Sequence, residues 1–486
     1  MSNTAQTQAG KRILSLLDQG SFVEIGGRVT ARNTDFNLQN KELPSDGVIT
    51  GYGTINESLV YVYSQDASVL GGSIGEMHAK KIVKLYDLAM KTGAPVIGLV
   101  DCAGLRIQEA TDALNAFGEV YMSQVLASGA VPQITAIFGT CGGGLALVPA
   151  LTDFTFMEEK TAKLFVNSPN TLDGNIISKC DTSSADFQSK EAGLVDGVGS
   201  EDDVLAQIRT LISILPSNYE DDMSYTECTD DLNRLCDGIE AGAKDAAYVL
   251  SVISDDNFFF ETKKEYAKEM VTGFIRINGA TIGAVANRSE RFGENDAVEQ
   301  EVEKFDTTLT AQGCEKAAAF VRFCDSFGIP VLTLTSVTGF KATTCQEKKI
   351  AKAAAALASA FADATVPKVN IVIGPAYGTA YNVMNSKALG ADLVYAWPQA
   401  SIGLMDAKAA VKIMYADEIA KGNGADVIAQ RSAEYEALQN GAVSAAKRGY
   451  VDDIIEPVET RQYVAAAYEL LFTKREDRPA KKHGAR

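Results

Sequence analysis

Gly93-Ala94-Pro95-Val96 opens a stretch of sequence that the chain repeats in its second half as Gly328-Ile329-Pro330-Val331. A glycine follows each stretch at the same spacing, first Gly104 and then Gly339. A second block returns in the same way, from Val131-Pro132, Gly139 and Gly143 to Val366-Pro367, Gly374 and Gly378. Every partner lies 235 positions after its counterpart (328 − 93, 378 − 143). A period this long is typical of a duplicated domain, because solenoid repeats span only tens of residues.

The sequence around these blocks predicts an α/β fold in both copies. The short apolar runs Val96–Val100 and Val331–Thr335, bounded by Gly and Pro, are typical of buried strands. Helical stretches precede these strands near residues 74–92 and 314–327. The match continues toward the N-terminal side with small shifts in spacing, for example from Asp18 to Asp255. We therefore predict two tandem domains, residues 1–240 and 241–486, joined through acidic sequence near 219–231.

Composition excludes several classes of function. Of the 486 residues 46% are hydrophobic and 22% charged, as is ordinary for a globular protein. The net charge of −18 argues against nucleic acid or an anionic membrane as the main partner. The eight cysteines form no CxxC pair, so we predict reduced thiols and no metal site. The first residues lack an apolar signal core, and we expect a cytoplasmic protein.

Two glycine-rich turns follow predicted strands in each copy. Glycine adopts positive φ readily and lets a ligand oxygen approach the backbone N–H closely. Where such N–H groups open a helix, the helix dipole also favours negative charge. The turns span residues 101–109 and 139–144 in the first copy, and 336–340 and 374–381 in the second. Four turns in two matched pairs predict two backbone sites that stabilise anions.

The scarcity of histidine narrows the chemistry further. The chain has only His78, inside a helical run where a structural role is expected, and His483, in a basic tail. No zinc-protease, P-loop or dinucleotide motif occurs. We predict an enzyme that stabilises oxyanions with backbone amides and receives its base from elsewhere.

Charged residues near the turns leave several interpretations open. Arg106 could hold a phosphate, orient the turn through Glu109, or form a surface i,i+3 ion pair with it. Lys81 and Lys316 occupy equivalent positions (316 − 81), which favours a shared structural role over contact with a CoA phosphate. Ala89-Met90-Lys91-Thr92 is similar to a biotin attachment sequence, but it ends a helical pattern, so we predict no biotinyl lysine here.

Blocks throughout the chain resemble one known family. They include Leu17–Glu24, Asp46–Gly53, Arg106–Glu109, Ala150–Phe156, Ala396–Pro398 and Arg478–His483, in that order. Together with the paired glycine turns, they resemble the carboxyltransferase subunits of biotin-dependent acyl-CoA carboxylases, of the propionyl-CoA carboxylase β type. The likeness runs nearly from end to end.

The resemblance implies two tandem crotonase-like domains, active sites at a subunit interface and, commonly, a hexamer. In such enzymes carboxybiotin releases CO2, the α-proton of an acyl-CoA passes to biotin, and the thioester enolate attacks CO2. Each domain then supplies one oxyanion hole. The resemblance further implies that biotin is carried on a separate protein, with a biotin carboxylase or membrane decarboxylase subunits as further partners.

Motif positions in the family give expected site residues here. Gly143 and Gly144 would serve the first hole with Gly104 nearby, and Thr379 and Ala380 the second with Gly339 nearby. The expected substrate-binding residues are Ala103, Arg106, Phe340, Tyr377, Gly378 and Asn382. Which hole binds biotin and which binds the thioester is left open.

The chain departs from the family pattern at several of these positions. The family's S-G-G-A-R turn reads Cys102–Arg106, and its Y-G-G-A-Y-D reads Tyr377–Asn382. Thr379 therefore stands where the first copy has Gly144, and it can donate its amide only if its φ is negative. A methionine–glycine loop of the family becomes Met405-Asp406. These changes leave the acyl group open.

Our leading hypothesis is carboxyl transfer between carboxybiotin and a short-chain acyl-CoA such as acetyl- or propionyl-CoA. The same half-reaction could run backwards in the α-subunit of a sodium-pumping methylmalonyl- or glutaconyl-CoA decarboxylase. A crotonase-type hydratase or isomerase is a further alternative, which would require a side-chain base. An inactive scaffold within a carboxylase complex is the last.

Overall fold

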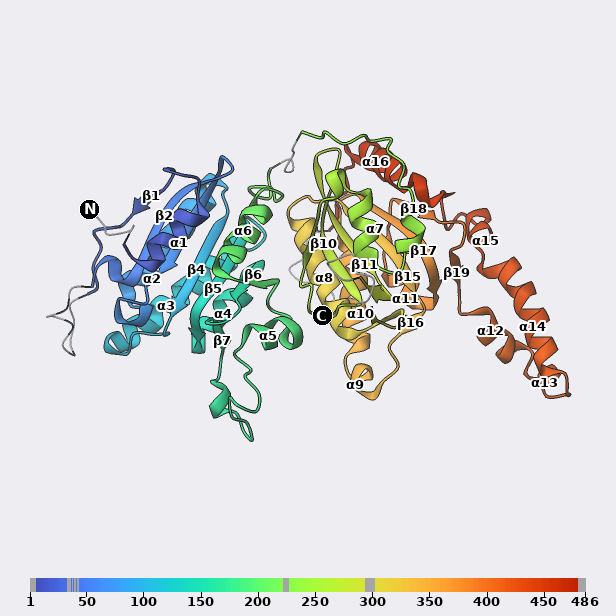
Figure 1. Ribbon diagram of the computed structural model, residues 1–486, viewed down its shortest axis with the longest axis horizontal. Helices are drawn as coiled ribbons and strands as arrows, with labels where there is room; N and C mark the ends of the chain where they lie inside the picture. The colour runs from blue at the N-terminus through green and yellow to red at the C-terminus, as the bar shows by residue number, and fades with distance from the viewer. Residues whose placement is uncertain are drawn as a thin grey trace. The chain divides into compact units, whose positions relative to one another are not determined.

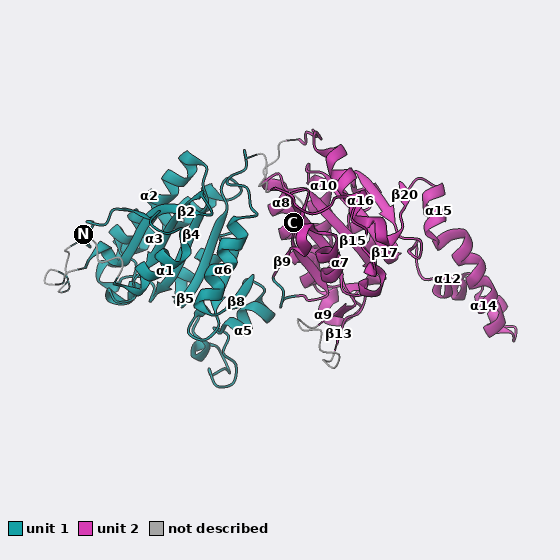
Figure 2. Ribbon diagram, turned by 45° about the horizontal axis from the view of Figure 1, so that its top comes forward, with its two compact units in different colours: residues 1–224, 263–266 teal, residues 225–262, 267–486 magenta. Residues whose placement is uncertain are grey.

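The computed structural model describes residues 6–32, 36, 38, 41, 43–221, 227–292 and 302–479. The chain divides into two compact units, unit 1 with residues 1–224 and 263–266, and unit 2 with residues 225–262 and 267–486 (Figure 2). His483 and the end of the 478–483 block lie outside the described residues, as do residues 222–226 of the acidic connector. The assignment of 1–240 and 241–486 to two domains stays a prediction.

Unit 1 is built on one mixed sheet. Its strands follow the order β1 (Val23–Ile25), β2 (Val48–Ile55), β3 (Ser58–Gln65), β4 (Val96–Cys102), β5 (Gln133–Gly142), β6 (Phe154–Glu158) and β8 (Gly197–Gly199). A further strand, β7 (Lys163–Phe165), pairs with the last residues of β5. The helices are α1 (Gln8–Leu16), α2 (Glu76–Thr92), α3 (Ala110–Ala127), α4 (Leu147–Ala150), α5 (Ala185–Phe187) and α6 (Glu201–Ile212) (Figure 1).

Unit 2 repeats this plan. Its sheet has the order β9 (Phe259–Thr262), β10 (Met270–Ile277), β11 (Ala280–Asn287), β15 (Val331–Val337), β17 (Lys368–Tyr377), β18 (Leu393–Ala396) and β20 (Asp453–Ile454). The strand β19 (Ser401–Gly403) pairs with the end of β17, as β7 does with β5. Four short strands lie outside this sheet: β12 (Glu290–Arg291), β13 (Glu303–Lys304), β14 (Thr308–Leu309) and β16 (Gly339–Phe340).

The helices of unit 2 include counterparts of those in unit 1 and an additional arm. The helices outside the arm are α7 (Ala246–Ile253), α8 (Ala311–Ser326), α9 (Thr344–Glu347), α10 (Ile350–Asp363), α11 (Gly378–Val383) and α16 (Thr460–Leu471). The arm contains α12 (Ala407–Met414), α13 (Ala416–Ile419), α14 (Gly424–Tyr435) and α15 (Ala442–Lys447), and it extends away from the sheet of unit 2 (Figure 1). It occupies the connection from β19 to β20, where unit 1 has a shorter loop.

The predicted strands form the buried centre of each sheet. Val96–Val100 of β4 and Val331–Thr335 of β15 are buried along their whole length. Both strands pair in parallel with neighbours on either side, which explains their continuous apolar sequence. The two predicted helical stretches are confirmed as α2 and α8. Each unit has its own hydrophobic core.

The repeated aspartates Asp18 and Asp255 hold the same turn in each unit. The carboxylate of Asp18 accepts the N–H groups of Asn56 and Glu57, at 3.1 and 3.0 Å, in the turn between β2 and β3. The carboxylate of Asp255 accepts the N–H groups of residues 278 and 279, at 3.3 and 2.7 Å, in the turn between β10 and β11. The sequence match at these positions therefore has a shared structural cause.

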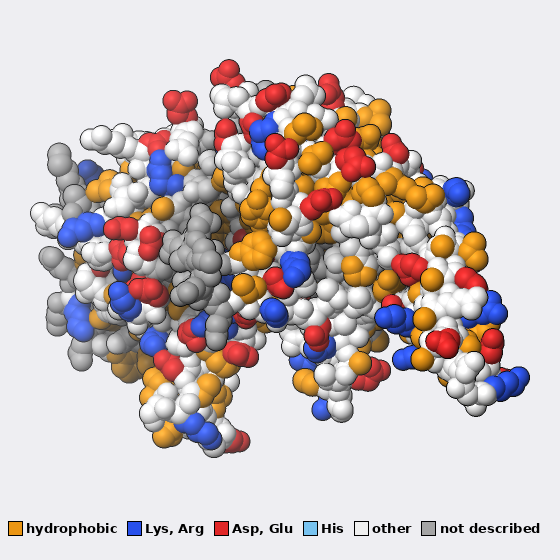
Figure 3. Space-filling view, turned by 45° about the vertical axis from the view of Figure 1, so that its right-hand side comes forward, with side chains coloured by type: hydrophobic (Ala, Val, Ile, Leu, Met, Phe, Trp, Pro, Cys, Tyr) orange, Lys and Arg blue, Asp and Glu red, His pale blue; other side chains and the backbone are white. Residues whose placement is uncertain are grey.

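The surface mixes both signs of charge. Acidic and basic side chains are interspersed over the face seen in Figure 3. Within the described ranges, we find no helix with the length and apolar character needed to cross a membrane.

Candidate oxyanion sites

The candidate sites lie at the carboxyl ends of the two central strands of each sheet, where the regular register is broken. In unit 1, β4 and β5 stay in register up to Val100, and the register shifts before Cys102 pairs with Cys141. In unit 2, β15 and β17 shift at the equivalent place, between Thr335 and Val337. Such an irregularity bends a strand and ends its regular pairing. Each pair of strands therefore ends in two separate glycine turns.

The second turn of each unit begins a short helix with a glycine in the left-handed region. Gly143 has φ +64° and begins the 3-10 helix Gly143–Ala146, and Gly378 has φ +63° and begins α11. The first N–H groups of a helix have no acceptor inside it, and they form its positive end. The amides of Gly143 and Gly144, and those of Thr379 and Ala380, thus lie at helix starts, the kind of position that binds anions.

The backbone of Thr379 has the φ that a β-branched donor requires, since this φ is not positive. It lies inside α11, and it is absent from the positive-φ residues of the described chain. Its amide therefore has the orientation of the second N–H group of a helix, and Thr379 is exposed. On the same helix Ala380 is buried and Asn382 is exposed.

Gly104 lies beside the first site, but its own N–H points elsewhere. Its φ is +104°, and a Cβ added there would lie 3.7 Å from the carbonyl oxygen of Gly142. The N–H of Gly104 donates to the sulfur of Cys102 at 3.2 Å, and its carbonyl accepts the N–H of Ile74 at 2.9 Å. The neighbouring Ala103 is exposed. The role of Gly104 is therefore to shape the turn beside the Gly143 amides.

Gly339 has a different setting in unit 2. It forms β16 with Phe340, and this strand pairs with Thr308–Leu309 and contacts α11. Its φ is +155°. Gly339 and Phe340 are therefore next to the helix that carries Thr379 and Ala380. Tyr377, the residue before α11, is half-buried, and burial raises the pKa of its phenol.

Arg106 is fully buried within an ionic cluster. Its guanidinium donates to a carboxylate oxygen of Asp46, to Glu109 Oε1 at 2.8 Å and to the carbonyl of Ser73 at 2.7 Å. The surface ion pair is thereby excluded, since the side chains of Arg106 and Glu109 are 0% and 1% exposed. With its donors directed into the protein, Arg106 is placed to orient the turn rather than to meet a phosphate. Direct contact with substrate stays an untested prediction.

His78 belongs to the same buried region. Its Nδ1 lies 2.9 Å from the carbonyl oxygen of Asp46, and its Nε2 lies 3.2 Å from Nε2 of Gln65. Burial lowers its pKa to about 3, and the nearby Arg106 charge acts in the same direction. The ring is therefore neutral at pH 7, with Nδ1 donating to the carbonyl and Nε2 accepting from the amide. This supports the structural role expected for it.

The two equivalent lysines also have structural contacts. The ammonium groups of Lys81 and Lys316 are buried and donate to the carbonyls of Val48 and Met270, the first residues of β2 and β10. Both lysines thus hold the start of the same strand in their unit.

Sequence reasoning missed Tyr121, which lies directly against the first site. Its hydroxyl donates to the carbonyl oxygen of Gly144 at 2.5 Å. Tyr121 is on α3, and the turn follows β5, so the contact exists only through tertiary packing. No local sequence pattern signals it.

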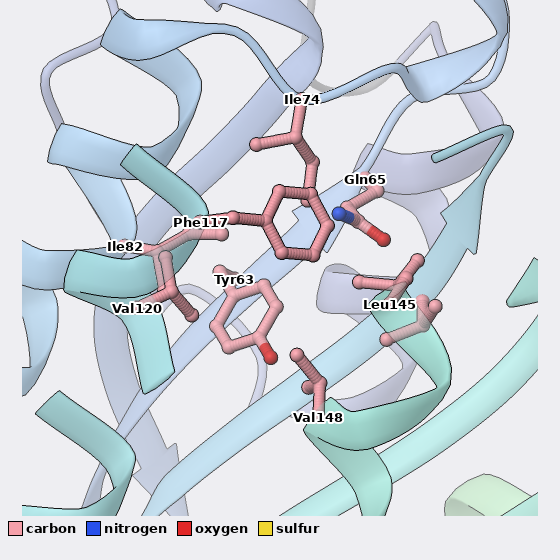
Figure 4. Close-up of a pocket in the computed structure, with 9 residues that line it drawn as sticks. Tyr63, Gln65, Ile74, Ile82, Phe117, Val120, Leu145 and Val148 are labelled. Carbon is pink, nitrogen blue, oxygen red and sulfur yellow. The ribbon is translucent and has the colours of Figure 1, made fainter. Parts of the chain in front are cut away.

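A small cavity lies in the core of unit 1 behind this helix. Its lining is mostly apolar, and Phe117 and Tyr63 present their rings to it beside the amide of Gln65 (Figure 4). It is about the size of a water molecule and cannot admit an acyl group. This cavity is therefore not a candidate for the acyl-binding site.

Known proteins similar to this chain have carboxyl transfer in common. The family model described as "Carboxyl transferase domain" matches residues 4–485. The propionyl-CoA carboxylase beta chain of Roseobacter denitrificans is 40% identical over 493 residues, covering 98% of this chain and 92% of that protein. The methylmalonyl-CoA decarboxylase subunit alpha of Propionigenium modestum is also 40% identical, with coverage of 98% and 92%.

Among solved structures, transcarboxylase 12S with hydrolysed methylmalonyl-CoA bound is similar with a TM-score of 0.91. The two chains are 36% identical, and the match covers 99% of this chain and 93% of the other. This similarity confirms the predicted fold of two tandem crotonase-like α/β domains. The chain belongs to the carboxyl transferase domain family, as a β-type carboxyltransferase subunit of the biotin-dependent acyl-CoA carboxylases.

Proposed function

We propose that this protein transfers a carboxyl group between carboxybiotin on a separate carrier protein and a short-chain acyl-CoA of the propionyl-CoA/methylmalonyl-CoA type. The observation that carries the proposal is the matched pair of helix N-termini at Gly143 and Gly378, with φ of +64° and +63°. The names of the relatives support the choice of acyl group. Acetyl-CoA is a further candidate substrate.

The exposed turns fit a ligand that arrives on another protein. A Cβ added at Gly143 would meet nothing within 4 Å, so space for a ligand oxygen is open beside this residue. Gly144 and Thr379 are exposed, which leaves the first amides of both helices accessible. A biotin group held by a carrier protein could therefore reach either turn.

The chain's own contribution is charge stabilisation and positioning. Carboxybiotin supplies the carboxyl group that is transferred. The amides of Gly143 and Gly144 would donate to one developing oxyanion, and those of Thr379 and Ala380 to the other. These residues carry no carboxylate or imidazole, so we assign them no proton transfer. Preorganised N–H groups at the positive end of a helix stabilise such charge without reorganising during the reaction.

The direction of the reaction has two candidates. The carboxylase relative and the decarboxylase relative are equally similar to this chain, at 40% identity. We propose the carboxylase direction as the main function and the α-subunit of a methylmalonyl-CoA decarboxylase as the second. Purification of the native complex distinguishes the two, since a biotin carboxylase or membrane subunits would accompany the chain.

We also propose that the chain assembles as a homo-oligomer, as a hexamer like the transcarboxylase 12S assembly. A biotin carboxyl carrier protein and biotin carboxylase are the partners of the carboxylase reaction. The cytoplasmic location stays a prediction.

Purified protein tested with free biotin and methylmalonyl-CoA, malonyl-CoA or glutaconyl-CoA provides the direct test. We expect decarboxylation that depends on biotin, with the highest rate for the preferred acyl group. Absence of turnover with every thioester would contradict the proposal and favour a scaffold. Turnover that does not require biotin would favour the hydratase-like alternative.

A further inference from the structure

We propose that Tyr121 is a positioning residue for the first oxyanion site, and that it explains why residue 144 is glycine where unit 2 has Thr379. The role of the site rests on the proposed function, whereas the fit between Tyr121 and Gly144 does not. The hydroxyl of Tyr121 bonds the carbonyl of Gly144, so it acts through the backbone of that residue.

The Tyr121 hydroxyl completes the bonding of the Gly144 carbonyl. This oxygen accepts the O–H of Tyr121 at 2.5 Å and also the N–H of Leu147, one turn along the 3-10 helix. Both of its lone pairs are thus used. Tyr121 is itself held by Phe117 one turn earlier on α3, with ring centroids 5.6 Å apart in an edge-on arrangement.

The position of this hydroxyl crowds a side chain at residue 144. A Cβ added to Gly144 would lie 3.1 Å from the Tyr121 oxygen. The φ of Gly144 is not positive, so backbone conformation alone does not require glycine there. The requirement comes from Tyr121.

Unit 2 has a different pair of residues at the two equivalent positions. The 235-residue offset places Ala356 of α10 at the position equivalent to Tyr121 (356 − 121), and α10 contacts α11. With only a methyl group at 356, residue 379 can carry a side chain, and Thr379 does. A β-branched residue restricts its own backbone, whereas glycine does not. Unit 1 therefore restrains Gly144 from outside, through the Tyr121 hydroxyl.

The consequence is a defined orientation for the Gly144 amide. Without the bond from Tyr121, the glycine pair Gly143-Gly144 would sample more conformations, and its N–H groups would spend less time aimed at the oxyanion. The loss would appear in the transition state, where the charge develops, more than in substrate binding.

The first experiment is Tyr121→Phe, which removes only the hydroxyl. We expect kcat in biotin-dependent decarboxylation to fall about threefold to tenfold, with KM within about twofold, the effect of one lost hydrogen bond. Tyr61→Phe is the matched control. Its hydroxyl bonds the side chain of Thr92 at 3.2 Å beside the start of β4, at the opposite end from the turns. We expect Tyr61→Phe to leave kcat unchanged.

A double-mutant cycle tests the fit itself. Gly144→Ala should lower kcat about tenfold or more in the wild-type background, because its Cβ meets the Tyr121 hydroxyl. In the Tyr121→Phe background the oxygen is absent, and Gly144→Ala should cost less than about twofold. The same cycle is measured by the free energy of unfolding, where Gly144→Ala should be less destabilising beside Phe.

An unchanged kcat in Tyr121→Phe would overturn the positioning role. An equal cost of Gly144→Ala in both backgrounds would overturn the proposed reason for glycine at 144. If the wild-type protein had no activity with any thioester, the proposed function would fail and the site role with it, while the unfolding cycle would still decide the fit.

Discussion

Gly143 and Gly139 are four residues apart, yet they are glycine for different physical reasons. Gly143 adopts φ +64° in open space, so its requirement is conformational. A Cβ at Gly139 would lie 1.9 Å from Oδ1 of Asp101, so its requirement is packing. Unit 2 repeats the distinction, with φ +63° at Gly378 and a Cβ-to-Ser336 Oγ distance of 2.6 Å at Gly374. The glycines that recur at the same spacing in both copies are therefore of two kinds. Some are needed because the turn has a positive φ, and others because a neighbouring side chain is too close for a Cβ.

At the residue scale, Gly143→Val should reduce turnover more than binding. Valine at this φ is strained, so the turn must change, and the oxyanion loses donors that act mainly on the transition state. We expect kcat to fall at least about 100-fold, the cost of removing oxyanion donors, with KM changed much less. Steady-state kinetics of biotin-dependent decarboxylation measures both.

Gly118→Ala is the matched control for this variant. Gly118 lies on the exposed face of α3, and a Cβ there would meet nothing within 4 Å. Alanine should keep full activity and slightly raise stability, since glycine is unfavourable inside a helix. An undiminished kcat in Gly143→Val would count against the whole assignment of the first site.

At the scale of elements, buried charges connect parts of the chain that the sequence separates. The Arg106 guanidinium joins Asp46, which precedes β2, to Glu109, which precedes α3. Glu109 in turn accepts the N–H of Glu76 at the start of α2, at 2.6 Å. The turn beside Gly104 is therefore fixed by three elements at once. This gives a physical reason for Arg106 and Glu109 to occur together without any contact with substrate.

The repeated aspartates give a prediction at this scale. Arg461 of α16 donates to Asp255 at 2.7 Å, and its side chain is 0% exposed, whereas Arg209 of α6 donates to Asp18 at 2.9 Å and is 30% exposed. Asp255→Ala leaves a buried guanidinium without its nearest carboxylate and should cost about 3–5 kcal/mol of unfolding free energy. Asp18→Ala should cost about 1 kcal/mol, because water can replace its exposed partner.

Denaturant unfolding of the two variants, followed by a probe in each unit, measures this difference. Asp18→Ala should affect the transition of unit 1 and Asp255→Ala that of unit 2. Equal costs would mean that burial of the arginine does not set the strength of these contacts.

At the scale of the whole molecule, the two units share a plan but differ in what they bury. Unit 1 holds His78, the one histidine among the described residues, and the equivalent position in unit 2 is Gly313 (313 − 78). His78 is faced by Asp46, Arg106, Lys81 and Gln65. Its burial gives unit 1 a group whose protonation opposes folding.

The contribution of His78 to the stability of unit 1 should fall in acid. Burial lowers the pKa of His78 from 6.5 to about 3. As the pH falls below 6.5, the unfolded chain therefore binds a proton on this ring, whereas the folded chain does not. The stability contributed by neutral His78 is complete above this pH and is lost progressively below it. Between pH 6.5 and 5 the loss should reach about 2 kcal/mol.

His78→Gln removes this titrating group, so the variant should lose less unfolding free energy than wild type between pH 7 and 5. The measurement is the unfolding free energy of unit 1 at three or more pH values, with wild type as reference. The same slope in the variant would assign the acid sensitivity to other groups.

Much of the fold could be predicted because local sequence patterns indicate it. Val96–Val100 and Val331–Thr335 are apolar runs that only a buried parallel strand explains, and they became β4 and β15. The glycine turns at residues 143 and 378 were predicted from spacing, and they do begin helices with positive φ. The interpretation of Arg106 as a surface residue failed because its partner Asp46 is 60 residues away.

The sequence by itself determined the duplication, the central strands β4 and β15, and the positions of the turns that would hold oxyanions. These features depend on which residue types occur at which spacing. Short-range steric limits and the period of the hydrophobic residues connect such patterns directly to local structure. Only the tertiary structure decided that Arg106 and His78 are buried, that Gly104 directs its N–H to Cys102, and that Tyr121 reaches Gly144. Those contacts join residues from different elements, and their energies depend on burial and distance that no local pattern contains.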